Sequence, residues 1–112
     1  MSKKQIEQYI PKALDAIQKY EIAENGEVPK QFNGYIASFG ASIRQAGLLA
    51  TTLFYANEQS NAEKERKKVI EAIEYIIEQN IIQNNQVDKK TRAKVEDAAV
   101  ALKLAIRTFK LV

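Results

Sequence analysis

The chain has 112 residues, a formal net charge of +3, 46% hydrophobic residues and 28% charged residues, a composition typical of one globular domain rather than a disordered segment. It contains no Cys and no His, which excludes disulfides, thiolate chemistry and Ser–His–Asp catalysis and removes the commonest general base and metal ligand. Its first residues carry no apolar signal core, and Gly, Ser, Gln and Arg interrupt the least polar stretch, 35–56. We therefore expect a single domain, 1–112, in the cytoplasm, with no membrane contact, no cofactor and no small-molecule substrate.

The hydropathy pattern predicts an all-α fold, a compact bundle of about five helices with no strands. The first helix is expected within residues 3–25, where apolar residues recur at helical spacing from Ile6 to Tyr20. Pro11 either begins its regular part or kinks it. Asn25-Gly26 is expected to cap its C-terminal end, because Gly takes the left-handed conformation without strain.

Val28-Pro29 marks the start of a second helix over about residues 29–46, because the residue before a proline is held extended. Small residues occupy every fourth position of this helix: Gly34, Ser38, Ser42 and Ala46. This small-residue stripe would let another backbone approach closely, so we expect a protein interface there. Gly47 interrupts the pattern, and residues 48–57 predict a short third helix that is almost wholly apolar.

Ser60-Asn-Ala-Glu63 is a capping box and predicts a fourth helix that runs to about Asn80. A connection rich in Asn and Gln follows. The fifth helix is expected to begin after Asp88 or Thr91, either of which can cap it. Its core stripe comprises Val95, Ala98, Ala99, Leu102, Ala105, Ile106 and Phe109, and its predicted second buried side comprises Val100, Leu104 and Leu111.

The excess positive charge lies in the last third of the chain. Residues 81–112 hold seven basic and three acidic residues, whereas residues 31–60 hold one of each. Lys103, Arg107 and Lys110 are spaced i, i+4, i+7, which predicts a basic stripe along one side of the last helix. Further candidates for contacts to a phosphate backbone are Lys89, Lys90 and Arg92 at the start of that helix, and Arg44. The alternatives are an ordinary solvated face for the stripe and, for Arg44, a snorkelling side chain.

Two other kinds of chemistry fit the residues less well. Glu71, Glu74 and Glu78 share a helical face, as in carboxylate-dependent metal nucleases, but neighbouring lysines favour a solvated face. A helix-turn-helix around Gly47 would offer DNA bases little besides two threonines and a tyrosine. We therefore expect that the protein is not an enzyme and does not read DNA sequence.

Three segments have a familiar order: YIPKALDAI at 9–17 followed by Val28-Pro29, GYIASFGASIRQAGLL at 34–49, and ALKLAIRTFKLV at 101–112. Together they resemble the small helical subunit, the fifth, of the Cmr complex, the type III-B CRISPR effector. Arg44, Lys103, Arg107 and Lys110 lie inside the similar segments. Lys89, Lys90 and Arg92 lie outside them and are candidates on charge alone.

The resemblance implies a non-catalytic, all-helical subunit of an RNA-guided antiviral ribonucleoprotein. Several copies would lie along a filament that holds CRISPR RNA, beside the large subunit and the backbone subunit. They would line the channel in which target RNA pairs with the guide, and cleavage would belong to the backbone subunits. The alternative is a helical adaptor that binds only protein, for which the small-residue stripe and the modest net charge are the sequence features.

Overall fold

The computed structural model describes residues 3–56, 61–84 and 86–112. Within these residues the chain forms five helices and one two-stranded sheet, which confirms the predicted all-α bundle of about five helices. The helices are α1 (Lys3–Lys19), α2 (Gln31–Ala46), α3 (Leu48–Tyr55), α4 (Asn61–Ile77) and α5 (Lys89–Ile106). Pro11 lies inside α1, so this helix begins before the proline.

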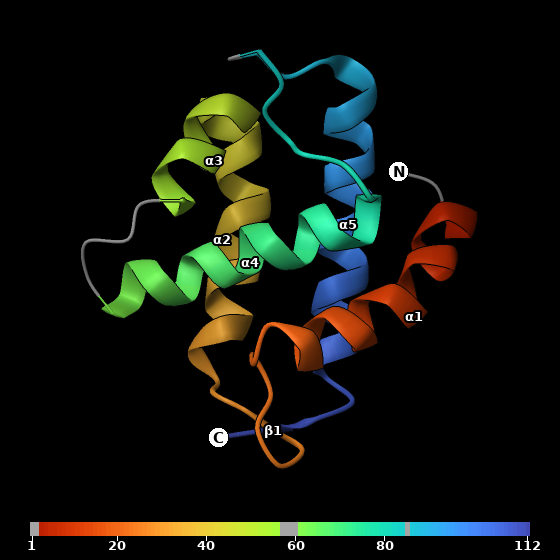
Figure 1. The fold of residues 1–112 in the computed structure, drawn as a ribbon, viewed down its shortest axis with the longest axis vertical. Coiled ribbons are helices and arrows are strands. Elements are labelled where there is room, and N and C mark those ends of the chain that lie inside the picture. The colour runs from red at the N-terminus through yellow and green to blue at the C-terminus, as the bar shows by residue number, and fades with distance from the viewer. Residues whose placement is uncertain (1–2, 57–60, 85) are drawn as a thin grey trace.

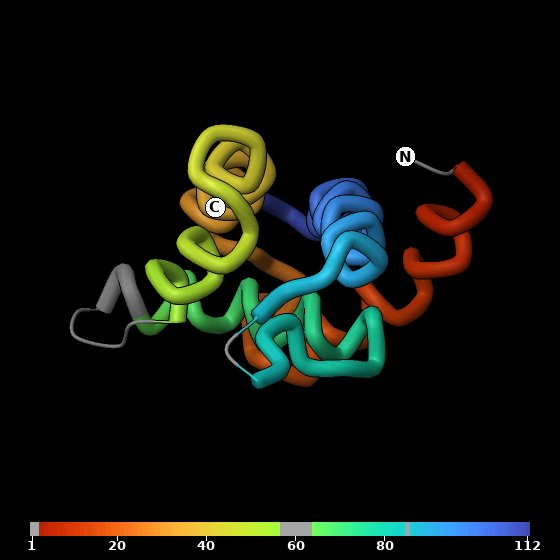
Figure 2. The backbone as a smooth tube through the Cα atoms, turned by 90° about the horizontal axis from the view of Figure 1, so that it is seen from above, coloured from red at the N-terminus to blue at the C-terminus, as the bar shows by residue number. Residues whose placement is uncertain are grey.

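The helices pack in two layers. α2 and α5 stand side by side, and α4 crosses in front of both (Figure 1). Viewed from above, α2 and α5 are seen end-on and α4 runs below them (Figure 2). α1 packs most extensively against α5, while α3 folds back beside α2. The radius of gyration is 12.9 Å, close to the value of about 13 Å for a folded chain of this length.

A single cluster of apolar side chains fills the space between the layers. Six members of the predicted α5 stripe are buried: Val95, Ala98, Ala99, Leu102, Ala105 and Ile106. The seventh, Phe109, lies beyond the end of α5 and is half-buried. The prediction that Leu104 and Leu111 widen this stripe is wrong, since they are 44% and 38% exposed. Asp97 and Ala101 are buried instead, so the second buried side of α5 lies elsewhere on the helix.

The predicted cap at the end of the first helix is wrong in position. α1 ends at Lys19, and Glu21 takes the left-handed conformation with φ of 58°. The N–H groups of Glu21 and Ile22 donate to the carbonyls of Gln18 and Ile17, which is a Schellman motif. Asn25-Gly26 instead forms a tight turn, in which Glu24 and Glu27 exchange two backbone hydrogen bonds. Positive φ at both turn residues matches the preference of Asn-Gly for such turns.

The prediction of a chain without strands is also wrong. β1 (Glu27–Val28) pairs in parallel with β2 (Lys110–Leu111). The Lys110 N–H donates to the Gly26 carbonyl at 3.1 Å, and the Val112 N–H donates to the Val28 carbonyl at 2.9 Å. Strands of two residues are too short to show alternating hydropathy. Their pairing places the C-terminal residues beside the loop between α1 and α2 (Figure 1).

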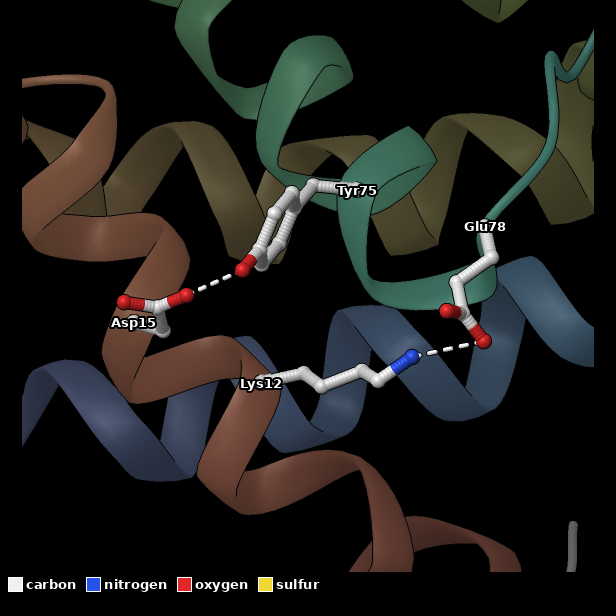
Figure 3. A network of polar contacts seen from close by, with 4 residues as sticks. All are labelled: Lys12, Asp15, Tyr75 and Glu78. Atoms are coloured by element: carbon white, nitrogen blue, oxygen red, sulfur yellow. Dashed lines mark hydrogen bonds and ion pairs between the residues drawn. The ribbon is translucent and has the colours of Figure 1, made fainter.

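Two polar contacts join α1 to α4 near the C-terminal end of α4. The Tyr75 hydroxyl donates to the Asp15 carboxylate, and the Lys12 ammonium lies 2.6 Å from a carboxylate oxygen of Glu78 (Figure 3). The bond to Asp15, with some desolvation, raises the pKa of the Tyr75 phenol. Because both side chains of the Lys12–Glu78 pair are exposed, this pair adds at most about 1 kcal/mol to stability.

Asp88 caps α5, which confirms one of the two predicted caps. Its carboxylate accepts a hydrogen bond from the Thr91 N–H at 2.6 Å. The predicted capping box of the fourth helix, Ser60 to Glu63, lies outside the residues whose side chains are described. At the other end of α4, the Glu74 carboxylate accepts from the Ile81 N–H at 2.9 Å and so holds the following loop.

We expect Asp88→Ala to lower the melting temperature near neutral pH, because the Thr91 N–H then loses its acceptor. Hydrogen bonds from the Thr91 backbone and then from its side chain hold the pKa of the Asp88 carboxyl below its ordinary value. This contribution to stability is therefore present above the unfolded pKa of about 4 and is lost as the pH falls through the folded pKa. Thermal melts of both proteins from pH 7 to pH 2 should show a difference that shrinks with acid. A difference that is constant with pH would contradict the assignment of the cap.

Candidate nucleic-acid interface

Four candidate cations share the outward face of α5. The four are Lys89, Arg92, Lys103 and Arg107, and Glu96 and Val100 lie between Arg92 and Lys103. Each of these six residues comes three or four positions after the one before it, so together they form one row along the helix surface. Arg107 is the C-terminal cap residue of α5 and is exposed. Lys90 lies on the helix beside Lys89 but outside this row.

The predicted helical position of Lys110 is wrong. α5 ends at Ile106, where the Phe109 N–H donates to the Ile106 carbonyl and the Thr108 hydroxyl donates to the Ala105 carbonyl. Lys110 therefore lies in β2, with its ammonium 3.9 Å from the Glu27 carboxylate. The predicted i, i+4, i+7 stripe is reduced to Lys103 and Arg107 at this end of α5.

A groove of about 150 Å³ lies between α2 and α5 and is lined by residues of both helices. Arg44 in the last turn of α2 lines one wall, and Lys103 and Glu96 line the other. Gly40 lies one turn before Arg44 and contributes no side chain to the groove. The fold thus brings together two candidate cations that are 59 positions apart in the sequence.

Carboxylates compensate only some of the candidate cations. Arg92 pairs with Glu96, its Nε lying 3.0 Å from Oε1, and Lys110 has the longer contact to Glu27. Within the described part of the chain, no carboxylate lies within ion-pair distance of the other five, which are Arg44, Lys89, Lys90, Lys103 and Arg107. Uncompensated cations along one side of a helix are suited to a polyanionic partner.

A sequence model of the CRISPR-associated protein family Cas_Cmr5 matches residues 5–107. The chain belongs to the Cas_Cmr5 family. This match confirms the resemblance seen in the three sequence segments and identifies the chain as a CRISPR-associated subunit of the Cmr type. No curated protein and no solved structure matches the chain.

The small-residue stripe of this Cas_Cmr5 protein faces away from its own core. Gly34, Ser38 and Ala46 are exposed and Ser42 is half-buried. Among the described residues, no atom outside the local backbone lies within 4 Å of the position that a Gly34 Cβ would take. Within the chain, the Ser38 side chain hydrogen-bonds Tyr55 of α3. The exposed positions Gly34 and Ala46 leave the stripe open to a neighbouring molecule.

An exposed apolar patch on α3 was not predicted as a site. Leu53 and Phe54 are 59% and 58% exposed. The Arg66 guanidinium lies over the rings of Phe54 and Tyr35, at 5.0 and 5.9 Å from their centroids. The sequence feature that could have indicated this patch is the scarcity of polar residues in 48–57. A helix with so few polar residues has apolar side chains on its outer face as well as its inner face.

The helix-turn-helix alternative fails on burial. Gly47 does separate α2 from α3, and its N–H caps α2 by donating to the Ile43 carbonyl. However, Thr51, Thr52 and Tyr55 are each 3% exposed. The polar side chains of α3 that could contact bases are therefore turned into the protein.

The prediction that the fourth helix runs to about Asn80 and carries Glu71, Glu74 and Glu78 on one face is wrong. α4 ends at Ile77, and Glu78 lies beyond it with φ of 59°, whereas Glu71 and Glu74 line one shared hollow. Glu74 holds the backbone of the following loop, and Glu78 pairs with Lys12. Among the side chains that the structure describes, no three acidic groups are placed so that they could hold a metal ion. Across residues 3–56, 61–84 and 86–112, no helix is long and apolar enough to cross a bilayer.

Proposed function

We propose that this Cmr subunit is a non-catalytic structural component of the RNA-guided ribonucleoprotein and that it contacts the backbone of the guide–target RNA hybrid. The observation that carries the RNA contact is the placement of Arg44 in the same groove as Lys103, with Arg107 one turn further along α5. None of the three has a carboxylate partner among the described residues. Family membership supports the assembly in which such a contact would occur.

The mechanism is electrostatic and depends on shape. Lys and Arg side chains along α5 would neutralise phosphates and release counterions, which gives affinity that falls with salt and does not depend on sequence. RNA duplexes are recognised largely through backbone and shape, because their deep major groove hides the base edges. A rigid helix carrying a row of cations meets this requirement without reading bases.

In this proposal the partners are the large subunit, the backbone subunit and further copies of the chain in the cytoplasm, together with CRISPR RNA and target RNA. The exposed stripe of α2 and the exposed patch of α3 would supply contacts to neighbouring subunits. Cleavage of the target would belong to other subunits, and this chain would need neither cofactor nor small-molecule substrate.

Purification of the tagged protein from its native host tests the proposal as a whole. We expect Cmr subunits together with short RNAs that carry repeat-derived ends. Partners that come without RNA after gentle purification at low salt would contradict the RNA role and favour a protein adaptor. Recovery of the chain alone would contradict both.

The adaptor alternative rests on the outward position of the small-residue stripe. If the chain binds only protein, Ser38→Leu should block assembly, because the added side chain fills a surface that a neighbouring helix must approach closely. Charge reversal on α5 should then change nothing. Pull-down of the other subunits by the Ser38→Leu variant tests the interface, and assembly that resists this change would contradict an interface at the stripe. Target-RNA binding by the α5 charge-reversal variant separates the two functions, because only the RNA contact predicts that it falls.

A further inference from the structure

We propose that the groove between α2 and α5 seats one phosphodiester of the RNA backbone between the Arg44 guanidinium and the Lys103 ammonium. This inference rests on the proposed function. That function requires a contact with the RNA backbone, and the inference assigns the contact to the groove between α2 and α5. In this groove, cations from two different helices face a common space, and neither has a carboxylate partner among the described residues.

The size of the groove suits a single anionic group. Its volume of about 150 Å³ is several times the liquid volume of one water molecule, about 30 Å³. Ala37 and Val100 contribute apolar wall on opposite sides. A phosphate that enters would displace loosely held water and meet two charged donors, where the less polar walls strengthen charge–charge attraction.

The two cations differ in a way that suits a phosphate. A guanidinium presents planar paired donors that bind two phosphate oxygens at once, whereas an ammonium acts as a compact point charge. Arg44 would therefore set the orientation of the phosphodiester, and Lys103 would add attraction from the other wall. Lys103 is half-buried, so its position is more restricted than that of an exposed lysine.

Gly40 keeps the groove open. It lies one turn before Arg44 on the same side of α2, where any side chain would project toward α5. Outside the local backbone of α2, a Cβ at this position would meet no atom of the described residues within 4 Å. Glycine is therefore not required by packing within the chain, although it costs helix stability relative to alanine. A small residue at this position leaves space for a ligand, which a long side chain would fill.

Glu96 is the acidic side chain in the groove, and Arg92 restrains it. The Arg92 Nε donates to Oε1 of Glu96 at 3.0 Å, one turn away on the same face of α5. This ion pair offsets the negative charge that would otherwise repel a phosphate. If a phosphate occupies the groove, Glu96→Gln should strengthen RNA binding, because it removes the remaining repulsion.

The test is target-RNA binding by the assembled Cmr complex, measured over a range of salt concentrations with variants of this subunit. Arg44→Gln and Lys103→Gln should each weaken binding by roughly 3- to 10-fold and flatten the log–log salt slope by up to about 0.9. The double variant should cost less than the product of the two single effects, because both side chains hold the same phosphate. Glu96→Gln should instead strengthen RNA binding.

Two substitutions of Gly40 distinguish the effect of blocking the groove from the effect of removing a charge. Gly40→Ala adds only a Cβ and should leave RNA binding unchanged while raising the melting temperature of the subunit. Gly40→Leu should weaken RNA binding to a similar extent as Arg44→Gln with all charges kept. A melting curve of each variant confirms folding, and Arg44→Gln, at an exposed position, tests the groove if Gly40→Leu fails to fold.

Arg107→Gln distinguishes failure of the groove from failure of the proposed function, because Arg107 lies outside the groove. If Arg107→Gln weakens RNA binding while Arg44→Gln and Gly40→Leu do not, the groove assignment is overturned and the RNA role stands. If no cation variant changes binding, both are overturned. If Arg44→Gln prevents assembly, the groove is a protein interface and the assignment is also overturned.

Discussion

Reversing the charge of Lys103 and Arg107 together should weaken target-RNA binding by the assembled complex at least tenfold near physiological salt without unfolding the subunit. Lys103 is half-buried and Arg107 is exposed, and neither has a carboxylate partner among the described residues. The double variant removes two cations and adds two anions beside a polyanion. Loss of two phosphate contacts should flatten the slope of log affinity against log salt by about 1.4–1.8.

The matched control is Lys3→Glu with Lys4→Glu in α1. Both lysines are exposed, neither is a candidate site, and the change in net charge is the same. If the α5 reversal acts through local phosphate contacts, the α1 reversal should change affinity far less. Equal effects from both pairs would show that only the overall charge matters, and unchanged affinity in the α5 variant would refute the role of this row of cations.

Phe39→Ala should destabilise the subunit by about 3–5 kcal/mol, because it opens a cavity where the core cannot fully collapse. Phe39 is 0% exposed, and its ring meets Tyr55 edge-on with centroids 5.1 Å apart. The Tyr55 hydroxyl in turn donates to the Tyr35 carbonyl at 2.9 Å, so these contacts join α2 to α3. At roughly 4 °C per kcal/mol for a domain of this size, the melting temperature should fall by about 10–20 °C.

Phe54→Ala provides the control for that prediction. It is the same substitution on the adjoining helix, but Phe54 is 58% exposed. Its loss should change the melting temperature by only a few degrees, through the Arg66 and Tyr55 contacts. Similar destabilisation by the two variants would contradict the assignment of Phe39 to the core and Phe54 to the surface.

The helices were predictable because their signals are local. Val28-Pro29 and Gly47 bound α2, and Asp88 caps α5, as each residue's own backbone preference requires. The apolar stripe from Val95 to Ile106 has the helical period and is buried. These features depend only on residues within one or two helical turns, so the local sequence is enough to predict them.

The features that were missed depend on tertiary pairing. Lys110 leaves the helical path because two residues of the tail pair with the loop after α1, and no local pattern encodes a parallel partner more than 80 positions away. Asn25-Gly26 suits either a helix end or a tight turn. It forms a turn because α1 ends several residues earlier, where Glu21 takes the left-handed conformation. Periodicity also cannot show that α5 buries Asp97, since that depends on the helices that pack around it.

The candidate site was predicted in part. Charge distribution found Lys103 and Arg107, and the isolation of Arg44 in an uncharged stretch marked it as unusual. The groove that Arg44 and Lys103 share follows from the packing of α2 against α5, which spacing along the chain cannot reveal. Similarly, the apolar character of residues 48–57 did not show which side of α3 is exposed.

The most direct test of the central claim is ultraviolet cross-linking of target RNA to the assembled complex, followed by mass spectrometry of the peptides of this chain. If the subunit contacts the hybrid backbone through the α2–α5 side, cross-linked peptides should include those around Arg44 and those from Lys103 to Arg107. These cross-links should disappear in the Lys103→Glu, Arg107→Glu variant. Cross-links confined to other faces of this chain, or none from it in a complex that binds RNA fully, would contradict the account.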